Sequence, residues 1–350
     1  MGYSSFLLIS ILFLTVVLNV ANGQPLVPAM FLFGDSSLDV GNNNHLLTVV
    51  KANFPPYGRD FENHIPTGRF SNGKLPIDFA AETFGFTSYP PAYLNLKIKG
   101  NNLLYGANFA SAGSGYSSLT SKLDGSISLN KQLEYYMEYQ KELVSIAGPN
   151  ASSIISGALY LIGAGTCDFM QNYFVNPLLK KLYTVDQFSD ILIGYCSNFI
   201  QNLYALGARR IVLITIPPIG CFPAAITIFG LHSNECVPWM NSAALNFNKK
   251  LNTISQDCRK MLPGINLVIL DTYQTLYDMV TKPSDYGFFE VRKGCCGTGV
   301  LETVLLCNHK SIGTCANASK YVFWDSIHPT EAANKILADD LIAAGKSLIS

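Results

Sequence analysis

Charged residues are scarce in this chain of 350 residues. Asp, Glu, Lys and Arg together make up only 14% of it, and 24 basic residues balance 24 acidic ones, so the net charge is zero. Proteins that bind nucleic acid or anionic membrane surfaces usually carry a basic excess. We therefore expect no nucleic-acid partner. Hydrophobic residues make up 49% of the chain, which is enough to fill a large core.

Apolar runs long enough to span a bilayer are also lacking. The longest run, residues 6–20, covers about 15 residues, and small residues follow it at Ala21 and Gly23. This pattern is typical of a signal-peptide core with its cleavage site. We predict a signal peptide over residues 1–23 and a secreted mature chain, residues 24–350, without a transmembrane segment.

Two glycosylation sequons and the nine cysteines agree with export. The sequons begin at Asn150 and Asn317, which we expect to carry glycans. Oligomeric state cannot be read from the sequence.

Six of the cysteines are expected to form disulfides, although their pairing cannot be deduced from spacing. They are Cys221, Cys236, Cys295, Cys296, Cys307 and Cys315. A zinc site is disfavoured because Cys295 and Cys296 are adjacent and an exported chain meets oxidising conditions. We expect no metal and no cofactor. Cys196 and Cys258 lie in helix-like stretches and are predicted to be buried free thiols.

Short apolar runs alternate with longer stretches of helical periodicity. The predicted strands are 29–33, 103–109, 158–163, 210–216 and 265–270, and the predicted helices are 75–84, 129–146, 185–206 and 235–261. Such alternation predicts one α/β domain with a doubly wound parallel sheet and helices on both faces. Ligands in these sheets bind beyond the carboxyl ends of the strands.

A serine stands at that edge. The first apolar run ends at Gly34 and leads into Asp35 and Ser36, and far along the chain Asp325 precedes His328 by three residues. A lone Gly-Asp-Ser is usually only a turn. Together with a carboxylate that can orient an imidazole, however, it favours a nucleophilic hydrolase, with Ser36 as nucleophile, His328 as base and Asp325 as its partner.

Several motifs make the chain resemble the GDSL lipase/esterase family of the SGNH hydrolase superfamily, in its secreted plant branch. The matching segments are 34–36 (Gly-Asp-Ser), 68–73 (Gly-Arg-Phe-Ser-Asn-Gly), 106–115 (Gly-Ala-Asn-Phe-Ala-Ser-Ala-Gly-Ser-Gly), 216–221 (Ile-Pro-Pro-Ile-Gly-Cys), 294–297 (Gly-Cys-Cys-Gly) and 325–328. The resemblance implies a three-layer α/β/α flavodoxin-like sandwich with a central five-stranded parallel sheet. It also implies hydrolysis of small-molecule or lipid carboxylic esters by Ser36, Asp325 and His328.

The oxyanion hole departs from the family pattern. The resemblance assigns one backbone donor to Gly113. It assigns a second donor, an asparagine amide, to a further family motif, Gly-x-Asn-Asp, but this chain has Cys167 in place of the asparagine, in Gly-Thr-Cys-Asp at residues 165–168. A thiol is a weak hydrogen-bond donor. Reduced turnover is expected, and a weakly active or inactive relative that binds extracellular lipid or glycan remains the alternative. A glycosidase using Asp35 and Asp325 would leave Ser36 and His328 without roles.

Overall fold

The computed structural model describes residues 25–95, 100–230, 233, 235–297, 307–308 and 314–349. The predicted signal peptide lies outside these residues. At the centre is a parallel sheet of five strands in the order β2-β1-β3-β4-β5. The strands are β1 (Met30–Gly34), β2 (Gly106–Asn108), β3 (Leu159–Gly163), β4 (Arg210–Ile214) and β5 (Asn266–Leu270). This is the flavodoxin-like strand order, and it confirms the predicted fold class.

Alternate residues of the strands serve two separate hydrophobic layers. On β1, Phe31 and Phe33 pack with Tyr136 and Phe199 on one face, whereas Leu32 belongs to the cluster on the other face. Both faces are apolar because both are covered by helices, which explains the unbroken apolar runs in the sequence.

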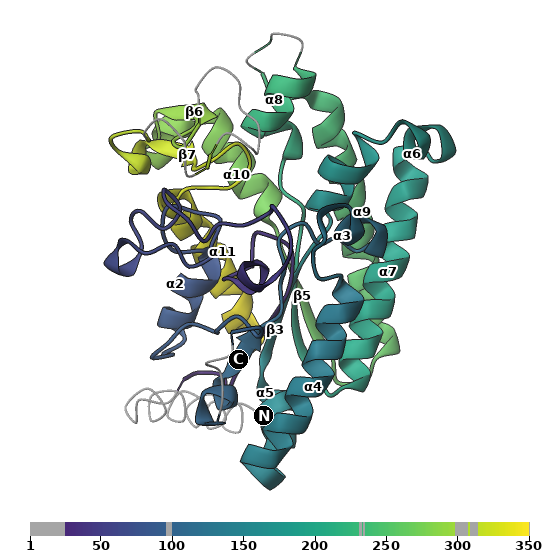
Figure 1. Ribbon diagram of the computed structural model, residues 1–350. Coiled ribbons are helices and arrows are strands. Elements are labelled where there is room, and N and C mark those ends of the chain that lie inside the picture. Colours follow the sequence, from purple (N-terminus) through teal and green to yellow (C-terminus); the bar gives the residue numbers. More distant parts are fainter. Residues whose placement is uncertain are drawn as a thin grey trace, which may run out of the picture.

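Long helices form the two outer layers (Figure 1). One side is covered by α4 (Leu129–Ala147), α7 (Val185–Ala205) and α9 (Pro238–Met261), and the other by α2 (Pro76–Thr83) and α11 (Glu331–Ser347), with α10 (Thr272–Thr281) beside α11. Four short helices complete the described chain: α3 (Ser118–Asp124), α5 (Ala151–Gly157), α6 (Pro177–Leu182) and α8 (Pro223–Phe229).

Two expected elements differ from those observed. The apolar run 103–109 yields only the three-residue strand β2, preceded by a 3-10 turn over Gly100–Tyr105. As an edge strand it pairs with β1 alone, and only at three positions. The helix expected from residue 235 begins at Pro238, because proline is favoured in the first helical turn, where its missing N–H costs nothing.

A second, two-stranded parallel sheet was not predicted. Its strands are β6 (Glu290–Gly294) and β7 (Tyr321–Phe323), each too short to show a period. The disulfides Cys295–Cys315 and Cys296–Cys307 follow β6 directly, and Cys221 pairs with Cys236 before α9. The six expected cysteines are thus all paired, while Cys196 and Cys258 are free and buried, as predicted.

Candidate active site

A glycine places the serine at the rim of the sheet. Gly34 ends β1 with φ +145°, and a Cβ there would lie 1.8 Å from the carbonyl oxygen of Gly163, so no larger residue fits between β1 and β3. The Asp35 N–H then donates to the same carbonyl at 3.0 Å. The buried Asp35 carboxylate accepts the N–H and hydroxyl of Ser37 at 3.0 and 2.8 Å. Asp35 therefore shapes the turn and leaves Ser36 partly exposed.

A glutamine from α4 secures this turn. Gln132 accepts the Gly34 N–H at 2.9 Å and donates to the Gly34 carbonyl at 2.9 Å. The side chain is fully buried, so these bonds have no competition from water. An isolated glutamine in a helical run carries no signal of its tertiary partner, so Gln132 was not among the predicted site residues.

The structure brings together the three predicted triad residues, although 292 residues separate Ser36 from His328. The His328 Nε2 lies 2.8 Å from the Ser36 hydroxyl oxygen, and its Nδ1 lies 2.8 Å from Asp325 Oδ2. A proton on Nδ1 donates to the carboxylate and leaves Nε2 free to accept the serine proton. Two further backbone donors, Ile327 N–H and His328 N–H, reach Asp325 Oδ1 at 2.9 and 2.7 Å.

The loop that carries Asp325 and His328 is fixed at both ends. The N–H groups of Cys295 and Cys296, just after β6, donate to the carbonyls of Phe323 and Trp324 at 2.9 and 2.6 Å. Beyond His328, the Thr330 hydroxyl caps α11, which begins at Glu331. Pro329 thus precedes the helix and its N-cap residue.

Burial, charge and hydrogen bonds together set the pKa values of the buried carboxyl groups of Asp325 and Asp35. Burial alone would raise the pKa of Asp325, but the attraction of His328 and the hydrogen bonds from His328 and Ile327 outweigh it and lower this pKa. Asp325 is therefore an anion at neutral pH. Burial raises the pKa of Asp35, in spite of the Ser37 hydrogen bonds.

The peptide that would supply the Gly113 donor is held by two side chains that sequence analysis missed. Asp39 accepts the Ala112 N–H at 3.0 Å, and Asn43 donates to the Ala112 carbonyl at 2.8 Å. Since a trans peptide is planar, fixing this carbonyl also fixes the direction of the Gly113 N–H. Asp39 and Asn43 follow Ser36 within seven residues, but no local pattern there indicates a partner near Gly113.

Cys167 lies beside this peptide. Its thiol is free and 6% exposed. Burial, followed by the negative charges of Asp35 and Asp168, raises its pKa well above the usual range, while the Gly113 N–H acts in the opposite direction. The thiol is thus neutral. The side chain that lines the cavity beside Ser36 is that of the preceding residue, Thr166.

Asp168 supports the same region from beneath. Its fully buried carboxylate accepts the N–H groups of Tyr116 and Ser117 at 2.7 and 3.2 Å and the Thr120 hydroxyl at 2.6 Å. Burial nevertheless raises its pKa to about 7. The last residue of the Gly-Thr-Cys-Asp segment therefore orders the chain that follows Gly113.

An apolar cavity of about 110 Å³ adjoins Ser36 and His328. It runs between the carboxyl ends of the central strands and the helices α2, α10 and α11. Aliphatic side chains dominate its wall, among them Leu75, Ile77, Ile214, Leu270, Leu337 and Leu341. Since α11 begins just after His328, Leu337 and Leu341 lie at increasing distance from the imidazole along the helix.

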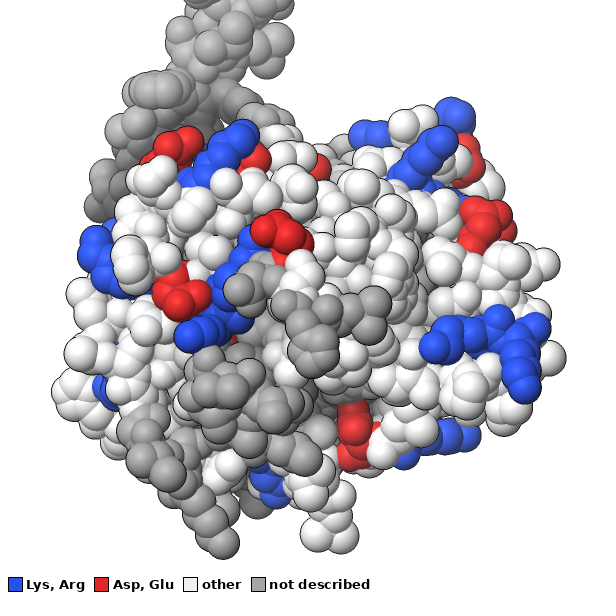
Figure 2. Space-filling view, turned by 90° about the horizontal axis from the view of Figure 1, so that it is seen from above, with Lys and Arg blue, Asp and Glu red and all other residues white. Residues whose placement is uncertain are grey.

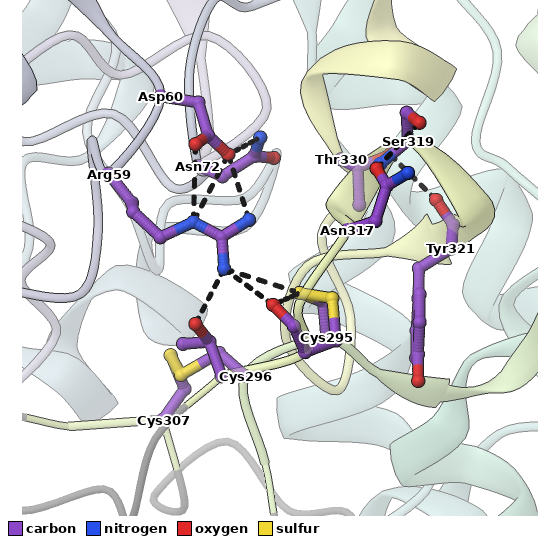
Figure 3. The surroundings of a disulfide bond; sticks show 12 residues. Arg59, Asp60, Asn72, Cys295, Cys296, Cys307, Asn317, Ser319, Tyr321 and Thr330 are labelled. Carbon is purple, nitrogen blue, oxygen red and sulfur yellow. Dashed lines mark hydrogen bonds and ion pairs between the residues drawn. A yellow bond between two sulfur atoms is a disulfide. The ribbon is translucent and has the colours of Figure 1, made fainter.

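The remaining predicted residues lie apart from this site. Asn150 and Asn317 are both exposed, and the Asn317 side chain accepts the N–H and hydroxyl of Ser319 (Figure 3). Across the described residues, no cluster of His, Cys, Asp and Glu could hold a metal ion.

Comparison with known proteins identifies close relatives. The model of the family described as GDSL-like Lipase/Acylhydrolase matches residues 30–341. A GDSL esterase/lipase of Arabidopsis thaliana is 60% identical over 339 residues, covering 96% of this chain and 94% of the relative. The GDSL esterase/lipase APG of the same plant is 55% identical over 348 residues, covering 99% of this chain and 98% of the relative.

Proposed function

This chain belongs to the GDSL-like lipase/acylhydrolase family and is a carboxylic ester hydrolase, and we propose that it works through an acyl-enzyme on Ser36. The observation that carries the proposal is the continuous hydrogen-bonded line from Ser36 Oγ through the His328 ring to Asp325, with 2.8 Å at each end. This is the geometry that a serine nucleophile needs for activation by a base.

In the first step, His328 Nε2 takes the Ser36 proton as the oxygen attacks the ester carbonyl. Asp325 stabilises the imidazolium that forms, and His328 then protonates the departing alcohol. In the second step, His328 removes a proton from water as the water oxygen attacks the acyl-enzyme carbonyl. The bond to Ser36 Oγ then breaks, the acid leaves, and His328 returns the proton to Ser36. Asp325 remains an anion throughout.

The negative oxygen of each tetrahedral intermediate would be bound by the N–H groups of Ser36 and Gly113. Cys167 occupies the third position and contributes little, because a neutral thiol donates weakly. Loss of one such donor typically lowers turnover about 10²–10³-fold. We therefore propose a slow enzyme rather than an inactive one.

The substrate class follows from the cavity beside Ser36. An uncharged aliphatic chain fits its wall, because each methylene transferred from water to such a site gains about 0.8 kcal/mol. A charged group would lose hydration among these aliphatic side chains. We propose that the ester carries a saturated or nearly saturated hydrocarbon chain.

The proposal also includes export of one hydrolase domain, residues 24–350, after removal of residues 1–23. Three disulfides and two exposed sequon asparagines support it. Among the described helices, none has the length and apolar character to cross a membrane. Mature protein should begin near Gln24 and lose mass on treatment with a glycosidase; retention of Met1 would contradict the proposal.

A second candidate is a lipid-binding relative with little turnover, which Cys167 and the cavity favour. Purified protein and its Ser36→Ala variant should be compared on short p-nitrophenyl esters. We expect hydrolysis by the first alone, and an organophosphonate should label Ser36. The neighbouring variant Ser37→Ala should still be labelled. Equal hydrolysis by the two proteins, or labelling of Ser36→Ala, would overturn the assignment of Ser36 as nucleophile. If the purified protein bound a hydrocarbon-chain lipid but hydrolysed no ester, the second candidate would be favoured.

A further inference from the structure

Tyr57 makes a hydrogen bond to the triad aspartate that the mechanism above does not use. Its Oη donates to Asp325 Oδ2 at 2.8 Å, and the two side chains are 3% and 2% exposed. Burial, and then the charge of Asp325, raise the pKa of Tyr57 well above the usual value. The hydroxyl therefore keeps its proton and acts as a donor at every pH at which an esterase works.

This bond completes the set of donors around the carboxylate. Oδ1 accepts the N–H groups of Ile327 and His328, while Oδ2 accepts His328 Nδ1 and the Tyr57 hydroxyl. An ionised carboxylate can accept about four hydrogen bonds. Without Tyr57, Oδ2 would keep only the imidazole as partner, in a place that water does not reach.

The ring of Tyr57 also supports the histidine. It contacts the Phe70 ring edge-on, with 5.8 Å between centroids, and the Phe70 ring lies 4.9 Å from the imidazole of His328. Tyr57 thus contacts Asp325 directly and supports His328 through the Phe70 ring.

The loop that carries Tyr57 is joined to the loop that carries Asp325. Arg59 donates to the carbonyl of Cys315 at 2.8 Å, and its guanidinium lies 5.1 Å from the ring centroid of Trp324, the residue before Asp325. Figure 3 shows Arg59 between its ion-pair partner Asp60 and the Cys295–Cys315 disulfide. The loop of Tyr57 is therefore anchored to the segment that precedes Asp325.

We propose that Tyr57 is a positioning residue of the ester hydrolysis, whose hydroxyl holds the Asp325 carboxylate in the orientation that His328 requires and withdraws part of its charge. The inference rests on the proposed roles of Ser36, His328 and Asp325. A donor that satisfies a charged partner in a buried network stabilises one arrangement of that network.

Tyr57→Phe removes only the hydroxyl and keeps both ring contacts. We expect kcat on a p-nitrophenyl ester to fall about tenfold, as for loss of a hydrogen bond to a charged group, with KM nearly unchanged. The carboxylate would then act more strongly on the imidazole and favour its protonated form. The acid limb of the kcat/KM profile, which reports protonation of the free base, should therefore move to higher pH.

Tyr160→Phe is the matched control. Tyr160 lies on β3 and is fully buried, in the hydrophobic cluster that also holds Phe31. Its hydroxyl donates to the Ile155 carbonyl at 2.9 Å. This variant loses the same atom from an equally buried place, so it should lose stability without any change in the pH profile. Thermal unfolding of both variants separates stability from catalysis.

Two outcomes would overturn the inference. One is an unchanged kcat in Tyr57→Phe, and the other is a loss of kcat with an acid limb that does not move upward, which would make the residue a packing element. The proton resonance of the His328 Nδ1–H should shift in Tyr57→Phe and not in Tyr160→Phe. If Ser36→Ala keeps full activity, the proposed function itself fails, whatever Tyr57 does.

Discussion

Asp39 accepts a hydrogen bond from the N–H of Ala112, 73 residues away, at 3.0 Å. The same carboxylate accepts the N–H groups of Gly41 and Asn42 at 2.7 and 2.8 Å, and it is fully buried. It joins the loop after Ser36 to the loop that carries Gly113. A side chain outside the predicted triad thus joins the segment of Ser36 to the segment of the predicted oxyanion donor.

Asp39→Asn should therefore lower turnover. An amide offers one oxygen where the carboxylate offers two, and its NH₂ would face backbone donors. We expect kcat to fall about 10–100-fold, a part of what loss of one oxyanion donor costs, with KM little changed. Steady-state kinetics would check this, with Asp339→Asn on exposed α11 surface as control. A change confined to KM would speak against a role in the oxyanion hole.

His328→Ala and Asp325→Asn should each remove most of the turnover while the protein still folds and is exported. The asparagine variant should keep more activity if Asp325 orients the imidazole and stabilises its charge. Because the two residues act as a unit, the double variant should be little slower than the slower single variant. Losses that add in the logarithm of kcat would indicate independent roles.

Cys167→Asn should restore the missing donor and raise kcat, by up to about 10²–10³-fold. The gain should appear in kcat because the amide acts on charge that develops in the transition state. Cys167→Ala should change little. Unchanged turnover in the asparagine variant would mean that another group already fills the hole, and collapse of the alanine variant would give the buried thiol a structural role.

Leu341→Phe should shorten the preferred hydrocarbon chain. Leu341 lines the cavity one helical turn farther from His328 than Leu337, so a larger ring there blocks its distant part. In a series of p-nitrophenyl esters from two to twelve acyl carbons, kcat/KM should fall for the long esters and hold for the short ones. Leu143 lies in the core of the opposite layer, so Leu143→Phe should either lower kcat/KM equally for all esters or leave it unchanged for all of them. A uniform loss in Leu341→Phe would show that the acyl chain binds elsewhere.

Asp168 should make the folded protein more stable at acid pH. Burial raises its pKa from 3.8 to about 7, so the folded state binds this proton more tightly than the unfolded chain. The resulting stabilisation is complete below about pH 3.8 and is lost as the pH rises through 7. Asp168→Asn cannot titrate, so its Tm should vary less than that of the parent between pH 5 and 8. If the Tm of the two proteins changed in parallel with pH, the prediction that protonation of Asp168 stabilises the folded state would be wrong.

Local sequence was enough to predict the central sheet and to single out Ser36, Asp325 and His328, which the structure brings together. Continuous apolar runs separated by helix-sized intervals leave few alternatives to a parallel sheet, because only strands covered on both faces are apolar throughout. Ser36 and His328 were found because each residue type stands beside a local feature: a strand end in one case, and a carboxylate three residues away in the other. The shared edge of the central strands explains the place of Ser36 only, because Asp325 and His328 follow β7 of the second sheet.

Tertiary structure alone decided which distant groups complete the site. Tyr57, Asn43 and Gln132 come from segments with no chemical motif, and their hydrogen-bond partners lie tens to hundreds of residues away. The pairing of Cys295 with Cys315 was likewise open, since spacing permits several pairings. The periodicity of apolar residues indicates which face of a helix or strand is buried, because residues of one face recur at fixed spacing along the chain. Which donor meets which carboxylate depends on how loops cross after the layers have packed, and no local pattern records that.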